Sequence, residues 1–164
     1  MINALVFDLE GTLINLPINY EALYESIRRE LGITKVQPLT KTAKKLDLNS
    51  REKLFKLWEI AEMKALRNFR INEEGIGLYR RYGNRPVALV TMQGKNVVEE
   101  IMNQLFLKFT VIVTREDSLD RKDQIKTAID LIGLAPDKVL VVGDRDSDKV
   151  AAMHVGCKFL KVKN

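Results

Sequence analysis

The chain has 164 residues, of which 46% are apolar and 30% are charged, and its formal net charge is +5. This composition is typical of a folded protein that buries one sizeable core, and it excludes a disordered or fibrous chain. No apolar run approaches the roughly 20 residues that a membrane-spanning helix requires, so no membrane partner is expected.

The excess of basic residues does not by itself indicate a nucleic-acid partner. These residues are interspersed with acids, as in "SREKLFKLWEIAEMKALRNFR" at 50–70, which is typical of solvated helix faces. The single Cys157 cannot form an internal disulfide, and the paired Cys and His spacing of a zinc site does not occur. The first residues resemble a strand rather than a charged leader followed by an apolar run, so we expect a cytoplasmic protein.

The first predicted strand is "NALVF" at residues 3–7, and it leads directly into two acids. Asp8 follows the apolar run, Glu10 stands two positions later, and Gly11 allows a turn. Carboxylates at the end of a buried strand are candidates for a functional site.

Residues 16–70 are predicted to form a helical insertion, because the segment before the second strand is far longer than one crossover helix needs. Asn49 followed by Glu52 is typical of a helix start. A stripe at helical spacing follows, and we interpret it as internal packing of the insertion: Leu54, Leu57, Trp58, Ala61 and Ala65. The next pattern, "NEEGIGLYRRYG" at 72–83, has acids first and basic residues last, and it predicts the crossover helix.

From residue 86 onward, apolar runs alternate with helical patterns. Strands are predicted at 86–91, 109–114, 138–144 and 158–162, and helices at 95–107 and 122–134. Runs of Val and Leu without polar alternation indicate strands that are buried on both faces of a parallel sheet. The chain is therefore predicted to be an α/β protein whose core comprises residues 1–15 and 71–164.

Functional groups follow three of the predicted strands: Asp8 and Glu10, then Thr91, and finally Asp144 and Asp148 in "GDRDSD". In an open parallel sheet the carboxyl ends of the strands meet at one edge, so we expect these groups to lie together. Carboxylates gathered this closely repel one another and lose solvation, which requires a cation among them. Mg²⁺ prefers oxygen ligands and fits such a group.

These residues resemble the motifs of the haloacid dehalogenase (HAD) superfamily of phosphohydrolases and phosphotransferases. "DLEGT" at 8–12 matches its first motif, DxDxT, and Thr91 matches the Ser or Thr of its second. A downstream lysine is the third motif, and "GDRDSD" matches the fourth, GDxxxD. The resemblance covers nearly the whole chain and implies a Rossmann-like, three-layer parallel sheet. It also implies that residues 16–70 are a small helical cap domain, of the kind that closes over substrate in many relatives.

The resemblance further implies a role for each matching residue. Asp8 is the nucleophile that takes the phosphoryl group as an aspartyl-phosphate. The carboxylates of Asp8 and Asp144 and the backbone carbonyl of Glu10 hold Mg²⁺, and Asp148 supports this metal site. The Thr91 hydroxyl and a lysine bind phosphate oxygens and offset the charge that develops during transfer.

Two positions depart from the family pattern. Glu10 stands where the family usually has an Asp, which protonates the leaving oxygen and then activates water. Glu can perform the same proton chemistry, but its extra methylene requires the carboxyl to fold back or the backbone to shift. The third motif is carried by Lys122 or Lys126, without the Lys-Pro signature of much of the family. We favour Lys122, which lies at the start of the predicted helix and nearer the crevice, and we interpret Lys126 as a surface charge.

Neighbouring polar residues complete the predicted site. Gln93 borders the same sheet edge and is a candidate substrate contact, as is Arg145. Lys95 either touches substrate or only begins a helix, and Asp146 is expected to face solvent or to cap a helix.

We therefore predict a cytoplasmic, Mg²⁺-dependent phosphohydrolase that acts on a small phosphorylated metabolite. Two alternatives are open. One is a phosphotransferase of the same superfamily, and the other is a non-catalytic HAD-like binding protein whose basic cap helices contact a partner. No motif identifies the phosphate ester, because specificity resides in cap side chains that carry no motif.

Overall fold

The computed structural model describes residues 1–164, and its centre is a five-stranded parallel sheet. The strand order is β5-β4-β1-β6-β7, which places β1 (Ala4–Phe7) in the middle. The other strands are β4 (Val87–Val90), β5 (Val111–Val113), β6 (Val139–Gly143) and β7 (Lys158–Lys161). Leu5 of β1 pairs with Val87 on one side and with Leu140 on the other. The predicted α/β fold with a parallel sheet is confirmed, and each predicted strand from residue 86 onward has its counterpart.

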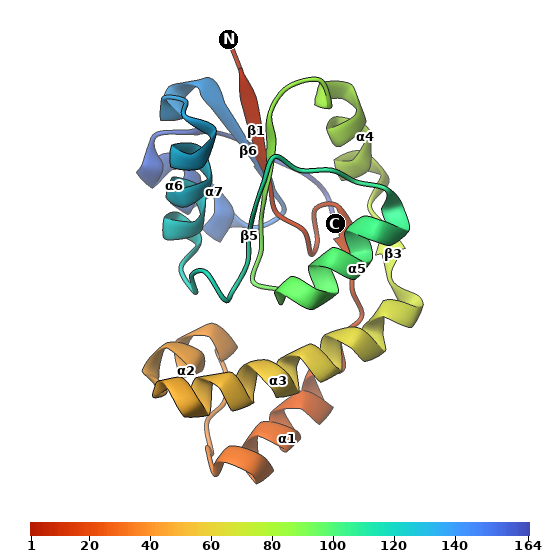
Figure 1. The fold of residues 1–164 in the computed structure, drawn as a ribbon, viewed down its shortest axis with the longest axis vertical. Helices are drawn as coiled ribbons and strands as arrows, with labels where there is room; N and C mark the ends of the chain where they lie inside the picture. Colours follow the sequence, from red (N-terminus) through yellow and green to blue (C-terminus); the bar gives the residue numbers. More distant parts are fainter.

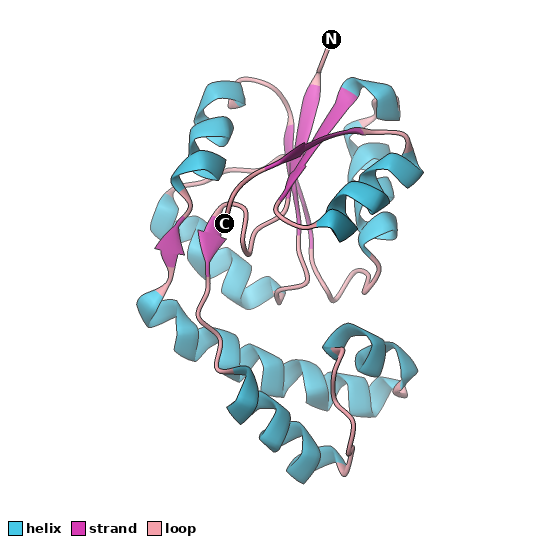
Figure 2. Ribbon diagram, turned by 180° about the vertical axis from the view of Figure 1, so that it is seen from behind, coloured by secondary structure: helices cyan, strands magenta, loops and turns pink.

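Helices cover both faces of the sheet, as Figure 1 and Figure 2 show. One face carries α4 (Glu73–Tyr82) and α5 (Lys95–Leu105), and the other carries α6 (Arg121–Ile132) and α7 (Asp146–Val155). Along β1, Leu5 and Phe7 belong to the first apolar cluster, whereas Ala4 and Val6 belong to the second. Because successive side chains of a strand point to opposite faces, this central strand is apolar on both. It ends at the sheet edge, where Asp8 follows.

The ends of the helices follow from capping residues, with one difference from the sequence prediction. Gly133 ends α6 in the left-handed conformation, with φ of 81°, and the Asn72 side chain caps the start of α4. The start of α3 lies earlier than predicted, because Asp47 rather than Asn49 is the N-cap. The Asp47 carboxylate accepts a hydrogen bond from the Ser50 backbone N–H at 2.8 Å. Asp and Asn are equally good caps, so composition alone did not separate the two positions.

The helical insertion, as named here, consists of α1 (Tyr20–Leu31), α2 (Leu39–Lys45) and α3 (Leu48–Ala65), followed by the short helix η1 (Leu66–Asn68). Figure 1 shows these helices beyond the carboxyl ends of the sheet strands. They pack around an apolar cluster of their own, which includes Leu23, Ile27, Leu54 and Trp58. The predicted helical insertion is therefore confirmed, and the division of the chain into domains at residues 16 and 70 stays a prediction.

A second, two-stranded sheet lies where the chain leaves the core and returns to it. β2 (Ile14–Asn15) pairs antiparallel with β3 (Arg70–Ile71). Strands of two residues have no periodic pattern, so sequence analysis did not predict them. A 3-10 helix, η2 (Pro136–Lys138), precedes β6.

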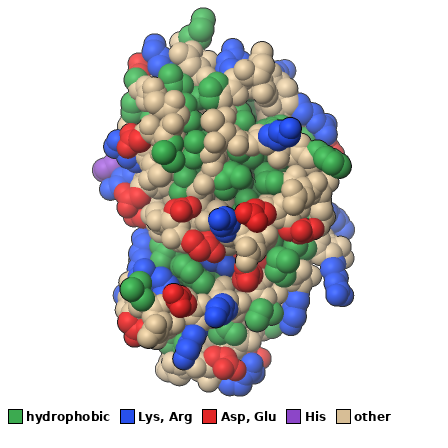
Figure 3. Space-filling model, in the orientation of Figure 1, with side chains coloured by type: hydrophobic (Ala, Val, Ile, Leu, Met, Phe, Trp, Pro, Cys, Tyr) green, Lys and Arg blue, Asp and Glu red, His purple; other side chains and the backbone are tan.

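Basic and acidic side chains are interspersed over the surface in Figure 3. None of the helices combines the length and the apolar character that crossing a lipid bilayer requires.

Candidate active site

Three of the predicted carboxylates meet at the carboxyl ends of β1 and β6. Asp8 follows β1, Asp144 follows β6, and Asp148 lies in the first turn of α7. Each offers one carboxylate oxygen, and these oxygens all lie within 4.8 Å of one another. The Thr12 hydroxyl lies 3.4 Å from Asp8 Oδ2 and 3.4 Å from Asp144 Oδ1, so it can donate to either. The structure thus brings together acids that are far apart in the sequence.

The close approach of these acids depends on Gly11. Its φ of +83° lies in the left-handed region, and a Cβ at this position would collide with the Asp144 carboxylate. The turn itself is held by backbone hydrogen bonds, from Leu13 N to the Leu9 carbonyl at 2.9 Å and from Gly11 N to the Ile14 carbonyl at 2.7 Å. A glycine here therefore lets the chain turn away from β1 without displacing the acids.

Arg121 supplies the positive charge at this cluster. It is the first residue of α6, and its Nη2 lies 3.0 Å from Asp8 Oδ1, while its Nε lies 3.2 Å from Asp148 Oδ1. One guanidinium thus contacts two of the three acids, which a planar group with several donors can do. Sequence analysis missed this residue because it considered only lysines for the third motif.

The structure gives Lys122 a different position from that of Arg121, and the role of Lys122 as the third-motif lysine stays a prediction. Lys122 is exposed and forms no ion pair with the acids of the cluster. Successive residues of a helix point about 100° apart, so Arg121 and Lys122 cannot both face the crevice. Lys126 is a surface residue, as expected, and its Nζ lies 2.8 Å from Asp130 Oδ1.

Asp8 is an unusual carboxyl because it is only 5% exposed. Burial raises its pKa to about 7; Arg121 acts in the opposite direction, and the charges of Asp148 and Asp144 raise it further. A divalent cation at the cluster would stabilise the ionised form of Asp8 and lower this pKa. A buried carboxyl with a perturbed pKa at a strand end is a candidate for chemistry.

The Glu10 carboxyl folds back toward its own chain, as the extra methylene requires. Its Oε2 accepts a hydrogen bond from the Leu16 backbone N–H at 2.6 Å. Burial raises the pKa of Glu10 to about 7, the bond from Leu16 opposes the shift, and the negative charge of Asp144 adds to it. Glu10 is not one of the three acids whose carboxylate oxygens lie within 4.8 Å of one another.

Thr91 and Gln93 form a hydrogen-bonded pair after β4. The buried Thr91 hydroxyl donates to Gln93 Oε1 at 2.7 Å, and the Gln93 backbone N–H donates to Thr91 Oγ1 at 3.1 Å. The Thr91 carbonyl accepts a hydrogen bond from Gln124 Nε2 at 2.8 Å. Gln93 lines the cavity described next, whereas Thr91 does not.

A cavity of about 710 Å³ joins the sheet edge to the insertion. Its volume is within the range of small-molecule sites. On the core side the lining residues are Asp8, Glu10, Met92, Gln93, Leu119, Asp120, Arg121, Arg145, Ser147 and Asp148. From the insertion and the segment between α1 and α2 they are Tyr20, Tyr24, Gln37, Pro38, Leu39, Thr40, Lys44 and Trp58.

Several neighbouring residues have clear positions relative to this cavity. Arg145 lines it, as expected for a candidate substrate contact, whereas Lys95 begins α5 and does not line it. Asp146 is exposed, begins α7 and lies 2.9 Å from Lys161 Nζ. Trp58 was assigned to internal packing, and the structure shows that it also lines the cavity.

The donor atoms of the acid cluster fit a hard divalent cation. Asp8, Asp144 and Asp148 offer only oxygen, and Arg121 is the only basic side chain that forms an ion pair with them. One guanidinium offsets one of three carboxylate charges when all are ionised. The remaining charge and the oxygen donors suit Mg²⁺.

Comparison with known proteins places this geometry in a family. Residues 80–162 match the family model described as haloacid dehalogenase-like hydrolase. Phosphoglycolate phosphatase from Neisseria gonorrhoeae is 24% identical, over 95% of this chain and 78% of that protein. The phosphoglycolate phosphatase of Neisseria meningitidis is similar to the same extent.

Solved structures share the fold at low sequence identity. A hydrolase from Pseudomonas syringae has a TM-score of 0.75 at 22% identity, over 96% of this chain and 82% of that one. CbbY from Rhodobacter sphaeroides, solved in complex with phosphate, has a TM-score of 0.75 at 13% identity, over 100% of this chain and 87% of that one. The family match, which spans half of the chain and includes its fourth motif, confirms the resemblance: the protein belongs to the haloacid dehalogenase-like hydrolases.

Proposed function

We propose that the protein is a Mg²⁺-dependent phosphohydrolase that cleaves a small phosphomonoester through an aspartyl-phosphate on Asp8. The observation that carries this proposal is the convergence of Asp8, Asp144 and Asp148, two of which pair with Arg121. Asp8, Asp148 and Arg121 line the cavity. The similarity to phosphatases that act on phosphoglycolate supports it.

Asp8 is the proposed nucleophile because it is the buried acid at the end of the central strand. One of its oxygens attacks phosphorus, the bond from phosphorus to the alcohol oxygen breaks, and an aspartyl-phosphate forms. Arg121, which lies 3.0 Å from Asp8 Oδ1, is placed to donate hydrogen bonds to the phosphoryl oxygens and to offset their charge. It takes the role that sequence analysis gave to Lys122.

The metal site that we propose uses the carboxylates of Asp8 and Asp144 and the backbone carbonyl of Glu10. Asp148 supports it through its contacts with Arg121 and with the Arg145 backbone N–H, which lies 3.2 Å from Asp148 Oδ2. Bound Mg²⁺ supplies positive charge that reduces repulsion between the phosphate and Asp8.

Glu10 is the proposed general acid and base. Its carboxyl gives a proton to the leaving alcohol oxygen, and the resulting carboxylate takes a proton from water. That water attacks the aspartyl-phosphate, phosphate leaves, and Asp8 is restored. A pKa of about 7 suits a group that must both give and take a proton near neutral pH. The Leu16 backbone N–H holds the carboxyl in one orientation.

Gln93 is the proposed contact on the phosphate side of the cavity, and Thr91 is the residue that positions it. The Thr91 hydroxyl holds the Gln93 side chain by accepting and donating within the pair, and Gln93 lines the cavity. We propose that the Gln93 amide reaches the substrate while Thr91 fixes its orientation.

The test is a screen of phosphorylated metabolites for phosphate release with Mg²⁺ and with a chelator, repeated with acceptor alcohols present. Asp8→Asn should abolish release by several orders of magnitude, because it removes the nucleophile and a metal ligand. Asp146→Asn is the control, since Asp146 belongs to the fourth motif but is exposed and paired with Lys161. Release that persists in Asp8→Asn would contradict the mechanism. Transfer to an alcohol in preference to water would identify a phosphotransferase.

A further inference from the structure

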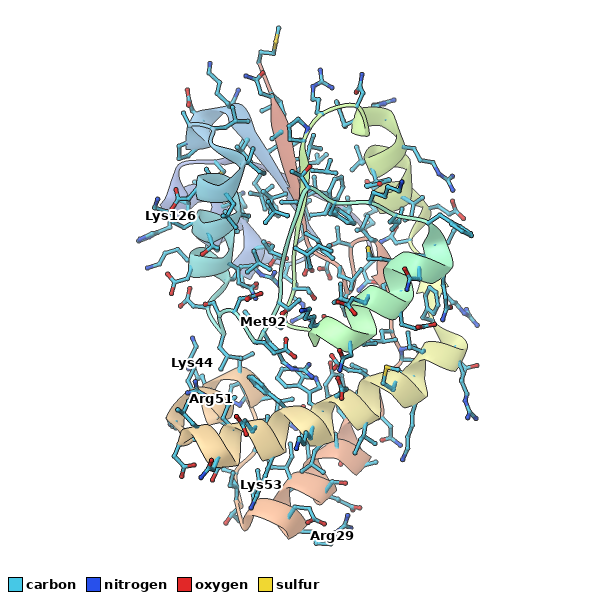
Figure 4. The ribbon with its side chains drawn as sticks, viewed as in Figure 1. Arg29, Lys44, Arg51, Lys53, Met92 and Lys126 are labelled. Atoms are coloured by element: carbon cyan, nitrogen blue, oxygen red, sulfur yellow. The ribbon has the colours of Figure 1, made fainter.

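The turn between β4 and α5 carries Gln93, the residue that we place against the phosphate. Figure 4 shows Met92, which precedes Gln93, at the end of the core that lies next to the insertion. The Gln93 amide oxygen is occupied, because it accepts the hydrogen bond from the Thr91 hydroxyl. Its Nε2 has no partner within the protein, so its donors are free for a ligand. Where these donors lie depends on the backbone of the turn.

Arg115 binds the carbonyl groups of this turn. It is buried and follows β5 in the core. Its Nη1 donates to the Met92 carbonyl at 3.3 Å, and its backbone N–H donates to the Gln93 carbonyl at 3.4 Å. The guanidinium also lies so close to Gly94 that a Cβ there would be 2.7 Å from Nη2. One arginine therefore binds two consecutive carbonyls of the turn and packs against its last residue.

Glu62 binds the same turn from the insertion. It lies on α3 and is buried, and its Oε2 accepts hydrogen bonds from Arg115 Nη1 at 2.8 Å and from the Gly94 backbone N–H at 3.3 Å. Gly94 is the N-cap of α5, so the carboxylate lies at a helix N-terminus, where the helix dipole favours negative charge. A single carboxylate of the insertion thus contacts both the guanidinium and the backbone of the turn.

The Arg115 guanidinium is itself fixed against α3. It lies over the Trp58 ring, 4.3 Å from the ring centre, and its Nη2 donates to the Phe55 carbonyl at 3.3 Å. Together with Glu62, three residues of α3 therefore contact this one side chain. A planar group with several donors can make all of these contacts at once, which the ammonium group of a lysine cannot. The placement of α3 thus determines where Arg115 and the turn lie.

We infer, on the basis of the proposed function, that Glu62 is a positioning residue for the phosphate contact, although it does not line the cavity. Through Arg115 and the Gly94 N–H it fixes the turn, and the turn fixes the Gln93 amide. The affinity of the site for phosphate therefore depends on how the insertion is docked on the core. Because such coupling is reciprocal, bound phosphate in turn favours the docked insertion.

Inorganic phosphate, with Mg²⁺ present, measures the contact without turnover. Calorimetry gives its dissociation constant for the wild type, Glu62→Gln, Gln93→Ala and the double variant. Gln93→Ala should weaken phosphate binding roughly tenfold, the order expected for losing one hydrogen bond to a charged group. Glu62→Gln keeps the size of the side chain and removes its charge, so the Gln93 amide should be displaced and binding should weaken by up to the same factor. When Gln93 is already Ala, Glu62→Gln should cause no further loss, because the contact through which it acts is gone.

The control for lost stability is Ile27→Ala, which removes buried packing within the insertion but does not contact the turn. It should lower stability and leave the affinity for phosphate unchanged.

A second measurement needs neither phosphate nor a substrate. In the free, ¹⁵N-labelled protein, the side-chain amide resonances of Gln93 should shift in Glu62→Gln and in Glu62→Asp, which keeps the charge but is one methylene shorter. They should stay in place in Ile27→Ala. An equal effect of Glu62→Gln on phosphate affinity in both backgrounds, including none at all, would overturn the inference, as would unshifted Gln93 resonances. A protein that hydrolyses no ester would instead count against the proposed function.

Discussion

The sheet edge and the insertion face each other across the cavity, and their side chains are held in different ways. At the sheet edge, Asp8 and Asp148 share the Arg121 guanidinium at 3.0 and 3.2 Å. On the insertion, the Trp58 N–H has no partner and Lys44 has only a distant one. Short ion pairs therefore hold the side chains of the first region, whereas no short polar contact holds Trp58 or Lys44 in the second. Groups that react need fixed positions, which the ion pairs at the sheet edge provide.

The two regions are joined by the buried pair of Glu62 and Arg115. Glu62 lies on α3, and Arg115 follows β5 in the core. A pair with both side chains at most 1% exposed is not easily separated, because each charge would be left without a partner in an apolar place. We therefore expect the position of the insertion to depend strongly on this contact.

The largest expected effect concerns the sheet edge. Glu10→Gln keeps the backbone carbonyl but removes the proton, so turnover should fall roughly 10²- to 10⁴-fold. The loss should fall mainly on hydrolysis of the aspartyl-phosphate. With an aryl phosphate, whose leaving group departs unprotonated, phosphorylated Asp8 should accumulate and give a burst. Glu10→Asp, which introduces the usual family residue, should remain active. Equal turnover without a burst would show that Glu10 is a bystander.

The second prediction concerns the junction. Arg115→Met leaves the buried Glu62 carboxyl with the Gly94 backbone N–H but without a cation, which should lower the free energy of unfolding by about 3–5 kcal/mol. Urea unfolding measures this change. Arg67→Met removes an exposed arginine of the same region and should change stability little.

The same variant should respond to pH in a defined direction. Burial raises the pKa of Glu62 and Arg115 opposes the shift, so without Arg115 the pKa of the folded state rises further. Between the unfolded and folded pKa values the folded state binds more protons, and stability therefore falls as pH rises. The difference in stability between wild type and Arg115→Met should therefore widen as pH rises above the ordinary pKa range of a glutamate. A stability difference that does not change with pH would show that ionisation of the Glu62 carboxyl does not cause the loss of stability.

Sequence analysis predicted the sheet edge far better than the insertion, and the reason is physical. Buried parallel strands require unbroken runs such as that before Asp8, and the topology of the fold then brings strand ends together. Sequence analysis weighed Lys122 against Lys126 and did not consider Arg121. Which basic residue faces the acids depends on where α6 begins, and the Asp120 cap determines that start. That Trp58 lines the cavity depends on how α3 packs against the core, which helical spacing alone does not contain.

The third prediction tests which basic residue acts. Arg121→Met removes the donors beside Asp8 and should lower turnover roughly 10²- to 10³-fold, the usual cost of losing one such group. Lys122→Met changes the adjacent, exposed residue and should have no effect on kcat. Rate measurements at saturating Mg²⁺ decide between them. A damaging Lys122→Met with a harmless Arg121→Met would restore the original assignment of the third motif.

The smallest expected effect concerns Asp148, which supports the reacting groups and is not the nucleophile. Its Oδ1 lies 3.2 Å from Arg121 Nε, and its Oδ2 accepts from the Arg145 backbone N–H. Asp148→Asn keeps an oxygen acceptor but removes the charge, so the Mg²⁺ concentration for half-maximal activity should rise roughly 10- to 100-fold. Asp146→Asn, in the same turn but exposed, should leave the Mg²⁺ requirement unchanged.

Saturating Mg²⁺ separates two roles for Asp148. If it supports the metal, high Mg²⁺ should restore most of kcat in Asp148→Asn. If it acts by orienting Arg121, the loss should persist at any Mg²⁺ concentration and resemble that of Arg121→Met.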